Sequence, residues 1–172
     1  MTTANKITLL RIILVPLFMV FLGIDNLTLA FIVYAIACIS DFLDGHIARM
    51  LNQISDFGKF MDPLADKMLV LSAMCYFSSI GRIPWWVTAI VCFREFAVSG
   101  LRMFAAEKNN IIAAATSGKI KTASTMISLA ILMLLKNNTL DIIAWLTILI
   151  TTVYSGVDYF IKNKGVFNHD PL

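Results

Sequence analysis

The chain has 172 residues, of which 59% are apolar and only 15% are charged, and its mean hydropathy is +0.80. A soluble domain of this size needs a far more polar surface, and a disordered chain would be poor in large apolar residues. A bilayer-resident protein remains, and at roughly 20 residues per span the length allows about six crossings. The net charge of +3 is modest, and we expect no nucleic-acid partner.

Six apolar segments follow one another along the chain, and they predict a single transmembrane domain over residues 1–172. Backbone groups in hydrocarbon must be hydrogen-bonded within their own segment, so each segment is expected to be a helix. Pro16 is expected to bend the first, Pro84 fits the first turn of the fourth, and Asn137 and Asn138 fit a turn. The fold class predicted is therefore all-α, with six transmembrane helices. The segments run over 7–23, 27–49, 60–80, 84–107, 119–135 and 140–161.

The basic residues predict the orientation of these segments. With six spans, both termini share one side of the membrane, and all the lysines and arginines except Arg82 and Lys136 fall toward that side. Loops rich in Lys and Arg stay in the cytoplasm. We therefore expect a multi-pass protein of the cell membrane with both termini cytoplasmic, and a polar site on that side would meet cytosolic substrates.

Four aspartates lie within or beside the ends of the second and third segments. Ionised carboxylates near lipid are costly, and four together repel one another, so a divalent cation would remove both penalties. Oxygen ligands favour Mg²⁺, Mn²⁺ or Ca²⁺ over zinc. On helices, Asp41 and Asp44 are separated by about 60° around the axis, and Asp62 and Asp66 by about 40°. Asp56 is expected in the loop between the segments, as a surface charge.

Small residues accompany the acidic pairs. Gly45 and Ala48 fall on the same helical stripe as Asp41, which would let a ligand or a second helix approach the backbone closely. Pro63 fits the first turn of the third helix, which would place Asp62 near the positive end of its dipole. We therefore expect the loop between the segments to bring the two acidic pairs face to face.

The acidic residues belong to a longer pattern, D-x-x-D-G-x-x-A-R, eight residues, then G-x-x-x-D-x-x-x-D. This resembles the signature of the CDP-alcohol phosphatidyltransferases. The resemblance extends to an N-terminal N-x-x-T-x-x-R and to the stretches REFAVSGLR and GKIKT, and it is strongest to the bacterial branch that makes phosphatidylglycerophosphate. The signature positions are Asp41, Asp44, Gly45, Ala48, Arg49, Gly58, Asp62 and Asp66.

The resemblance implies a reaction and roles for these residues. Such enzymes transfer the phosphatidyl group of CDP-diacylglycerol to an alcohol and release CMP, with two divalent cations, Mg²⁺ or Mn²⁺, and typically as homodimers. Asp41, Asp44 and Asp62 would hold metal, and Asp66 would be both a ligand of the second metal and the general base on the acceptor hydroxyl. The CDP-lipid pocket would be lined by Gly45, Ala48, Arg49 and Gly58.

Basic residues at membrane depth bear on which alcohol accepts the group. Arg94 lies in the middle of an apolar segment, where an unpaired guanidinium is expensive. Glu95 is about 100° away around the helix, an imperfect partner, and Arg102 is about 80° from Arg94. A phosphorylated acceptor would neutralise such cations, which favours sn-glycerol 3-phosphate. Lys119 and Lys121 point to opposite faces, so at most one should face the site. The predicted acceptor site comprises Thr8, Arg11, Arg94, Arg102, Lys119 and Lys121.

Three other interpretations remain open. A sibling enzyme using inositol phosphate, serine or phosphatidylglycerol would carry the same metal signature. A small cation transporter would also place acidic residues on membrane helices, although it does not account for Gly45 and Ala48. A scaffold pairing through small residues is a third. Tyr154, Asp158 and Tyr159, near the last cytoplasmic end, are interpreted as interface anchors and a surface charge.

Overall fold

The computed structural model describes the backbone of residues 3–51, 56–107 and 115–164, and the side chains of residues 13–40, 67–105 and 115–164. In these ranges the chain forms six α-helices and no strand, as predicted. The many Leu, Ala and Met residues favour helix because their side chains lose little freedom in it. The helices are α1 (Thr3–Gly23), α2 (Leu27–Leu51), α3 (Asp56–Ser79), α4 (Trp85–Glu107), α5 (Thr116–Leu134) and α6 (Asn138–Lys162).

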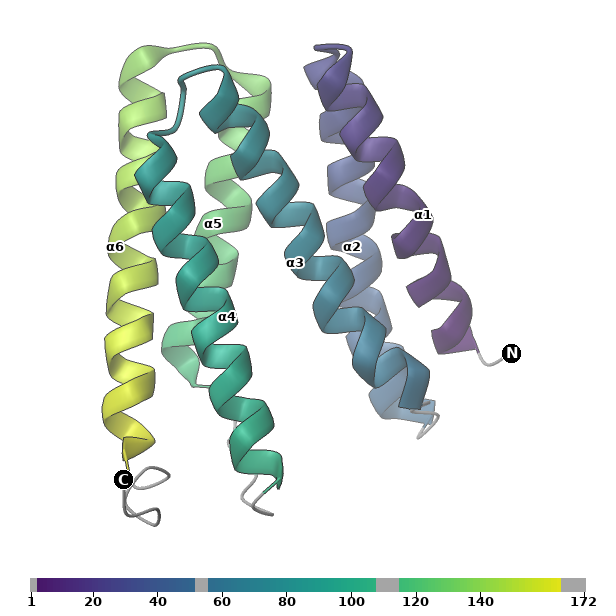
Figure 1. Cartoon of the computed structure of the whole chain (residues 1–172). Coiled ribbons are helices and arrows are strands. Elements are labelled where there is room, and N and C mark those ends of the chain that lie inside the picture. Colours follow the sequence, from purple (N-terminus) through teal and green to yellow (C-terminus); the bar gives the residue numbers. More distant parts are fainter. Residues whose placement is uncertain (1–2, 52–55, 108–114, 165–172) are drawn as a thin grey trace.

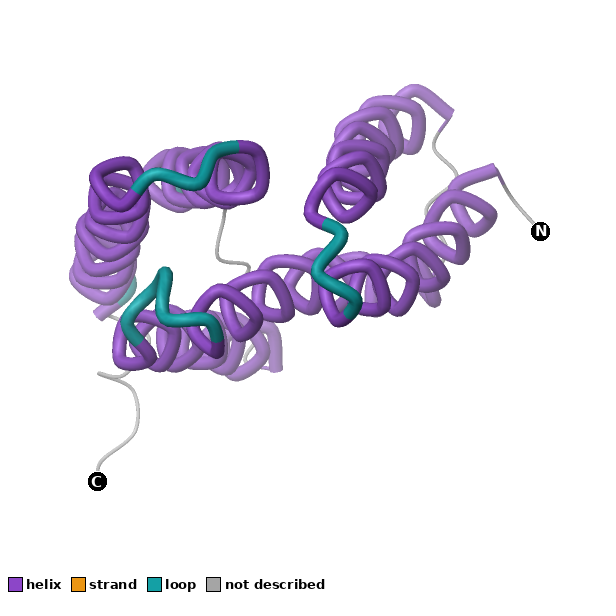
Figure 2. Tube along the Cα trace, turned by 90° about the horizontal axis from the view of Figure 1, so that it is seen from above, coloured by secondary structure: helices purple, strands orange, loops and turns teal. Residues whose placement is uncertain are grey.

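The helices alternate in direction (Figure 1). Residues 24–26, 80–84 and 135–137 connect them at one end, which we call the short-loop end and which faces the viewer in Figure 2. The start of α1 and the end of α6 lie toward the opposite end, which we call the terminal end. α2 therefore runs toward the terminal end and α3 runs away from it. α1 packs against α2 and α3, while α6 packs against α4 and α5.

The short connections are fixed by local polar contacts. The side-chain oxygen of Asn26 accepts a hydrogen bond from the backbone of Leu29 (3.1 Å), and that of Asn137 accepts one from Thr139 (2.9 Å), so each asparagine satisfies a free N–H at a helix start. Gly81, with φ 75°, supplies the left-handed residue of the turn before α4. Pro84 directly precedes α4, one residue before the position we expected.

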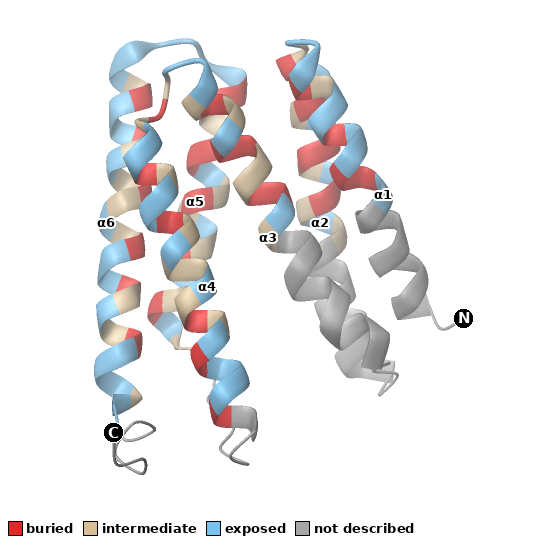
Figure 3. Ribbon diagram, in the orientation of Figure 1, coloured by how far each residue is buried: buried red, intermediate tan, exposed pale blue. Residues whose placement is uncertain are grey.

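The apolar core lies toward the short-loop end (Figure 3). All six helices contribute to it, and small residues let them approach closely: Ala30 of α2 and Ala73 of α3 are fully buried. In lipid such close packing, rather than exclusion of water, holds helices together. The largest fully buried side chains of this core are Phe18, Leu69, Met74, Phe77, Ile83, Val87, Val91, Leu129, Leu132 and Ile148.

A buried ion pair closes the short-loop end. Arg82, in the connection before α4, donates from Nε and Nη2 to the two carboxylate oxygens of Asp141 in the first turn of α6 (2.8 and 2.5 Å). Its Nη1 and Nη2 also donate to the backbone oxygens of Leu132 and Leu135 near the end of α5 (2.6 Å each). The guanidinium lies 5.3 Å from the centre of the Phe77 ring. The connection before α4 is thereby joined to the connection between α5 and α6.

The outward faces of the helices are apolar. Trp85, Phe93 and Ile150 are 76%, 77% and 64% exposed, a surface that suits contact with lipid. Among the helices whose side chains are described, α6 is the one that is both long and apolar enough to cross a bilayer. By length and composition α6 is thus a candidate membrane span, and the six predicted spans remain a prediction.

Several helix boundaries differ by a few residues from the expectation, since α1 begins at Thr3 and α5 at Thr116, and the start of α3 matters most for the signature. α3 begins at Asp56, not near residue 60, so Asp56 is the first residue of a helix and not part of a loop. Pro63 consequently lies inside α3, beyond its first turn, and the expectation that Asp62 lies at the positive end of the helix is wrong. The polar residues before the apolar segment continue the helix, because helix formation does not require apolar side chains.

Candidate active site

A buried cluster of charged side chains links α4 to α5 and lies closer to the terminal end than the apolar core does. One oxygen of Glu95, Oε1, accepts hydrogen bonds from Nη1 of Arg94 (2.9 Å) and from Nζ of Lys121 (2.6 Å). The side chains of Arg94, Glu95 and Lys121 are only 12%, 13% and 5% exposed. Glu95 is therefore not the imperfect partner that we expected, because its side chain bridges two cations from two helices. We call Arg94, Glu95 and Lys121 the basic triad.

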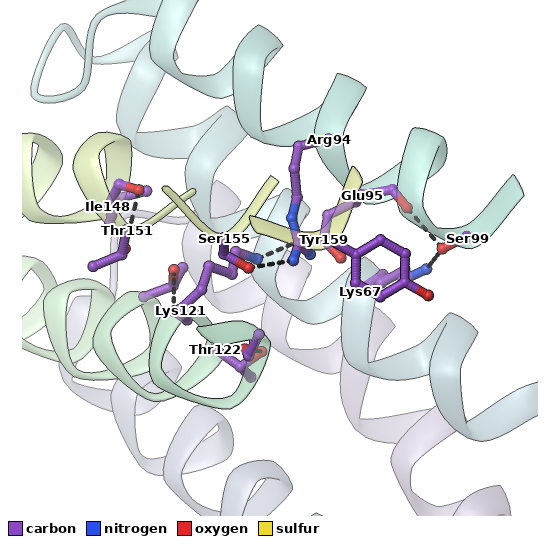
Figure 4. Close-up of polar contacts among 12 residues, drawn as sticks. Lys67, Arg94, Glu95, Ser99, Lys121, Thr122, Ile148, Thr151, Ser155 and Tyr159 are labelled. Atoms are coloured by element: carbon purple, nitrogen blue, oxygen red, sulfur yellow. Dashed lines mark hydrogen bonds and ion pairs between the residues drawn. The ribbon is translucent and has the colours of Figure 1, made fainter. Parts of the chain in front are cut away.

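α6 supports the triad from its other side (Figure 4). Nη2 of Arg94 donates to the hydroxyl of Ser155 (2.6 Å). Two glycines let the arginine pass close to the neighbouring backbones: a Cβ on Gly156 would lie 3.4 Å from Cγ of Arg94, and one on Gly118 would lie 3.9 Å from its Nη2. Arg94 is thus seated between α5 and α6, where larger residues would restrict its position.

α3 reaches the triad through a short chain of hydrogen bonds. Nζ of Lys67 donates to the hydroxyl of Ser99, which donates to the backbone oxygen of Glu95 (2.7 Å), as Figure 4 shows. Lys67 directly follows Asp66, the last residue of the acidic signature, in the sequence. This contact places the backbone at the end of the signature beside the helix that carries Arg94 and Glu95.

The charges of the triad do not balance. Arg94 and Lys121 share one carboxylate, which leaves a net charge of +1 on the triad itself. Nε of Arg94 is buried and has no acceptor among the described residues. The hydroxyl of Thr152, one turn before Gly156 on α6, is likewise buried without a described partner. A buried site with a surplus of cations and a spare donor is suited to an anion, which would compensate the charge.

A sequence model described as "CDP-alcohol phosphatidyltransferase" matches residues 1–153. The chain belongs to this family. The family consists of membrane enzymes that generally depend on divalent cations. The described cluster therefore lies in a membrane-integral transferase. The four-aspartate signature lies within the matched residues.

Curated relatives carry names from one branch of the family. The CDP-diacylglycerol–glycerol-3-phosphate 3-phosphatidyltransferase of Bacillus subtilis (strain 168) is 37% identical over 92% of this chain and 93% of its own length. The enzyme of the same name from Salmonella typhimurium is 34% identical over 92% and 93%. The probable phosphatidylglycerophosphate synthase of Mycobacterium tuberculosis (strain H37Rv) is 36% identical over 91% of this chain and 78% of its own length.

The family signature is divided between two helices. Its first half lies near the end of α2 and its second half in the first part of α3, so both halves lie toward the terminal end. The signature side chains lie outside the described residues, and so do those of Thr8 and Arg11 on α1. The expectation that the acidic pairs face each other therefore stays a prediction. The side chains concerned are those of Asp41, Asp44, Gly45, Ala48, Arg49, Gly58, Asp62 and Asp66.

The structure separates the four described residues of the predicted acceptor site. Arg94 and Lys121 lie together in the basic triad, whereas Lys119 is exposed, because residues two apart on a helix point to nearly opposite sides. Arg102 does not reach the triad. Its Nε donates to the hydroxyl of Tyr159 on α6 (3.0 Å), and its guanidinium lies 5.4 Å from the centre of that ring.

Tyr159, interpreted as an anchor, and Asp158, interpreted as a surface charge, have other surroundings. Tyr159 is only 2% exposed, so it is a packed partner of Arg102 and not an interface anchor. Asp158 accepts hydrogen bonds from Ser117 of α5 (2.5 Å) and Lys162 (3.0 Å), and so joins two helices. Tyr154, by contrast, is exposed, as an anchor would be.

Sequence reasoning did not predict the contacts that Glu95, Ser155 and Lys67 make at this site. A signal for Ser155 was present, because Thr152, Ser155 and Tyr159 recur at helical spacing and form a small polar stripe on one face of α6, all of it buried. A signal for Lys67 was its place directly after the signature. Nothing in the spacing predicted that Glu95 would bridge to Lys121, which follows 26 positions later on another helix.

Proposed function

We propose that this protein transfers the phosphatidyl group of CDP-diacylglycerol to sn-glycerol 3-phosphate, giving phosphatidylglycerophosphate and CMP in phospholipid biosynthesis. The observation that carries the proposal is the buried basic triad next to the acidic signature. Membership of the family accounts for the CDP-lipid, and the surplus of positive charge accounts for a phosphorylated acceptor. The names of the relatives from Bacillus, Salmonella and Mycobacterium agree with this choice.

The acidic signature would hold two divalent cations, Mg²⁺ or Mn²⁺. Four carboxylates supply only hard oxygen donors, which suit these ions. Asp41 and Asp44 come from α2 and Asp62 and Asp66 from α3, and both stretches lie toward the terminal end, so the donor set fits this group. When bound, the cations neutralise the pyrophosphate and stabilise the charge on the departing CMP.

The chain's own residues would then carry out a direct transfer. The acceptor hydroxyl attacks the phosphorus that bears diacylglycerol, and Asp66 takes the hydroxyl proton as the new P–O bond forms. The bond between that phosphorus and the bridging oxygen breaks, and CMP leaves with the electron pair. No nucleophilic side chain is required. The CDP-lipid would be bound by Gly45, Ala48, Arg49 and Gly58.

The basic residues would bind the acceptor. Arg94 and Lys121 would bind the phosphate of glycerol 3-phosphate, with the spare Nε of Arg94 as an additional donor. Arg102 is hydrogen-bonded to Tyr159 and lies apart from the triad, so it would orient the acceptor at the edge of the pocket. Thr8 and Arg11 of α1 would complete the pocket. Lys119 would contribute only to the surrounding positive potential, because it is exposed.

The protein would cross the cell membrane six times as a homodimer, with both termini and the active site on the cytoplasmic side. The shared location of the start of α1 and the end of α6 supports an even number of crossings. Single cysteines placed at Lys136 and at Lys164 test it: a membrane-impermeant thiol reagent added to intact cells should label only the former. Equal labelling of both would contradict this orientation. Crosslinking in native membranes tests the dimer.

The reaction is tested by offering labelled CDP-diacylglycerol to the purified protein with a panel of alcohols. We expect phosphatidylglycerophosphate and CMP in equal amounts with glycerol 3-phosphate, and no turnover after EDTA until Mg²⁺ or Mn²⁺ is restored. Preferential use of inositol phosphate, serine or phosphatidylglycerol would assign the chain to a sibling activity. Activity that is indifferent to EDTA would contradict the metal assignment.

A further inference from the structure

Glu95 is the acidic residue at the centre of the basic triad, and its negative charge means that it cannot bind the acceptor phosphate itself. Its Oε1 atom alone receives both the Arg94 and the Lys121 hydrogen bonds, at 2.9 and 2.6 Å. Two cations bonded to one oxygen lie close enough to repel each other strongly in a buried site. The carboxylate is therefore what allows these two side chains, which come from different helices, to share one place before any substrate arrives.

The backbone of Glu95 is held as firmly as its side chain. Its carbonyl oxygen accepts a hydrogen bond from the hydroxyl of Ser99 (2.7 Å). That hydroxyl in turn accepts a hydrogen bond from the ammonium group of Lys67 on α3. Arg94 is fixed from the opposite direction by Ser155 and by contact with Gly156. One acidic residue thus fixes the positions of two cations relative to α3, α4, α5 and α6, and it still leaves the triad with a net positive charge.

We propose that Glu95 is a positioning residue for the phosphate of the acceptor: it holds Arg94 and Lys121 at a fixed separation and leaves their remaining positive charge for a phosphate group. The inference rests on the proposed function and names a residue that sets acceptor affinity without touching the reacting atoms. Preorganised cations bind a phosphate more tightly because less side-chain order is lost on binding.

The test compares Glu95→Gln with the wild type in two measurements. The first is the KM of each substrate, and the second is the Kd of inorganic phosphate for the purified protein without CDP-lipid, measured by calorimetry. We expect the Kd of phosphate and the KM of glycerol 3-phosphate to rise about tenfold or more, with the KM of CDP-diacylglycerol and kcat within about twofold. An unchanged or lower Kd of phosphate would overturn the proposal, since it would make Glu95 a bystander or a competitor for the cations.

Asp141→Asn is the matched control, because it also removes a buried carboxylate charge from an arginine, at the far end of the bundle. It should lower thermal stability and leave both acceptor measurements within about twofold of the wild type, so a rise in the Kd of phosphate in this variant equal to that in Glu95→Gln would also overturn the proposal. Should Glu95→Gln not fold, Glu95→Asp keeps the charge and retracts the oxygen by one methylene. The Kd of phosphate should then rise about threefold or more, and an unchanged value would contradict the positioning role.

The proposed function is tested separately from this inference. Turnover of the wild type with glycerol 3-phosphate decides the function, and it does not involve Glu95 variants. The comparison of phosphate Kd values decides the role of Glu95, whichever alcohol the wild type prefers, because it measures phosphate binding without turnover and compares it with the Asp141→Asn control.

Discussion

Two buried arginine–carboxylate pairs lie at different levels of the helical bundle, and their surroundings differ. At the short-loop end, every nitrogen of the Arg82 guanidinium has an acceptor, and both oxygens of Asp141 have a donor. In the basic triad, Nε of Arg94 has no described acceptor, and Glu95 serves two cations with one oxygen. The first arrangement is closed, and the second is open to a further anion.

The difference shows how one kind of interaction can serve stability in one place and binding in another. A buried pair whose nitrogens and oxygens all have partners leaves nothing for a ligand, so the Arg82 pair joins the connection before α4 to the one between α5 and α6 and stabilises the fold. A pair with surplus charge is less stable by itself, and the ligand completes it. Residual charge and unused donors, rather than burial alone, therefore distinguish the binding region from the structural one.

The largest expected effect lies in the acidic signature, outside both pairs. Asp66→Asn should reduce kcat about a thousandfold, because the acceptor hydroxyl would lose its general base. Binding of CMP, measured by calorimetry with Mg²⁺ present, should persist, since the neighbouring aspartates remain. A fully active variant would remove Asp66 from its proposed role.

Breaking the Arg82–Asp141 pair should lower the stability of the protein and leave its activity unchanged. Replacing Asp141 with asparagine leaves Arg82 buried with an uncompensated charge, which typically costs about 3 kcal/mol or more. We expect a clear fall in the melting temperature of the detergent-solubilised protein, with the KM of glycerol 3-phosphate unchanged in the folded fraction. A variant as stable as the wild type would show that the pair does not join the connections.

Weakening the basic triad should have the opposite effect, a loss of function and not of stability. Lys121→Ala should raise the KM of glycerol 3-phosphate about tenfold to a hundredfold, because a charge-assisted contact to the phosphate is lost. Lys119→Ala is the matched control on the same helix, and since Lys119 is exposed its effect should stay within about twofold. Equal effects of the two substitutions would contradict the separation of the two lysines.

Arg102 should show a smaller effect than Lys121. It contacts Tyr159 and lies apart from the triad, so Arg102→Ala should raise the KM of glycerol 3-phosphate about threefold and leave that of CDP-diacylglycerol unchanged. Steady-state kinetics with each substrate varied in turn separates the two. An effect larger than that of Lys121→Ala would place Arg102, and not the triad, at the phosphate.

The sequence predicted the helices well because their apolar runs are long and the turns carry clear signals such as Asn137. It failed at the start of α3, where polar residues from Asp56 onward continue the helix and periodicity offers no boundary. The signature predicted the family, which the match over residues 1–153 confirms, whereas the roles of its aspartates stay predictions. The partners of Arg82 and Arg94 could not be predicted, because they depend on how separate helices pack.

Angular arguments about neighbouring residues also had a limit. An angle of about 100° between Arg94 and Glu95 describes where their Cβ atoms point, but both side chains are long enough to turn toward each other. The burial of Tyr159 was missed for a related reason, since a tyrosine near a helix end suits an interface as well as a core. Only packing against Arg102 decides between them.

The central claim is that the basic triad binds the acceptor. Measuring the binding of glycerol 3-phosphate to the purified protein tests it most directly. Calorimetric titration without CDP-lipid should detect one site per chain in the wild type and in Asp141→Asn, and at least tenfold weaker binding in Lys121→Ala. Undiminished binding by Lys121→Ala, or its loss in a folded Asp141→Asn protein, would contradict the account.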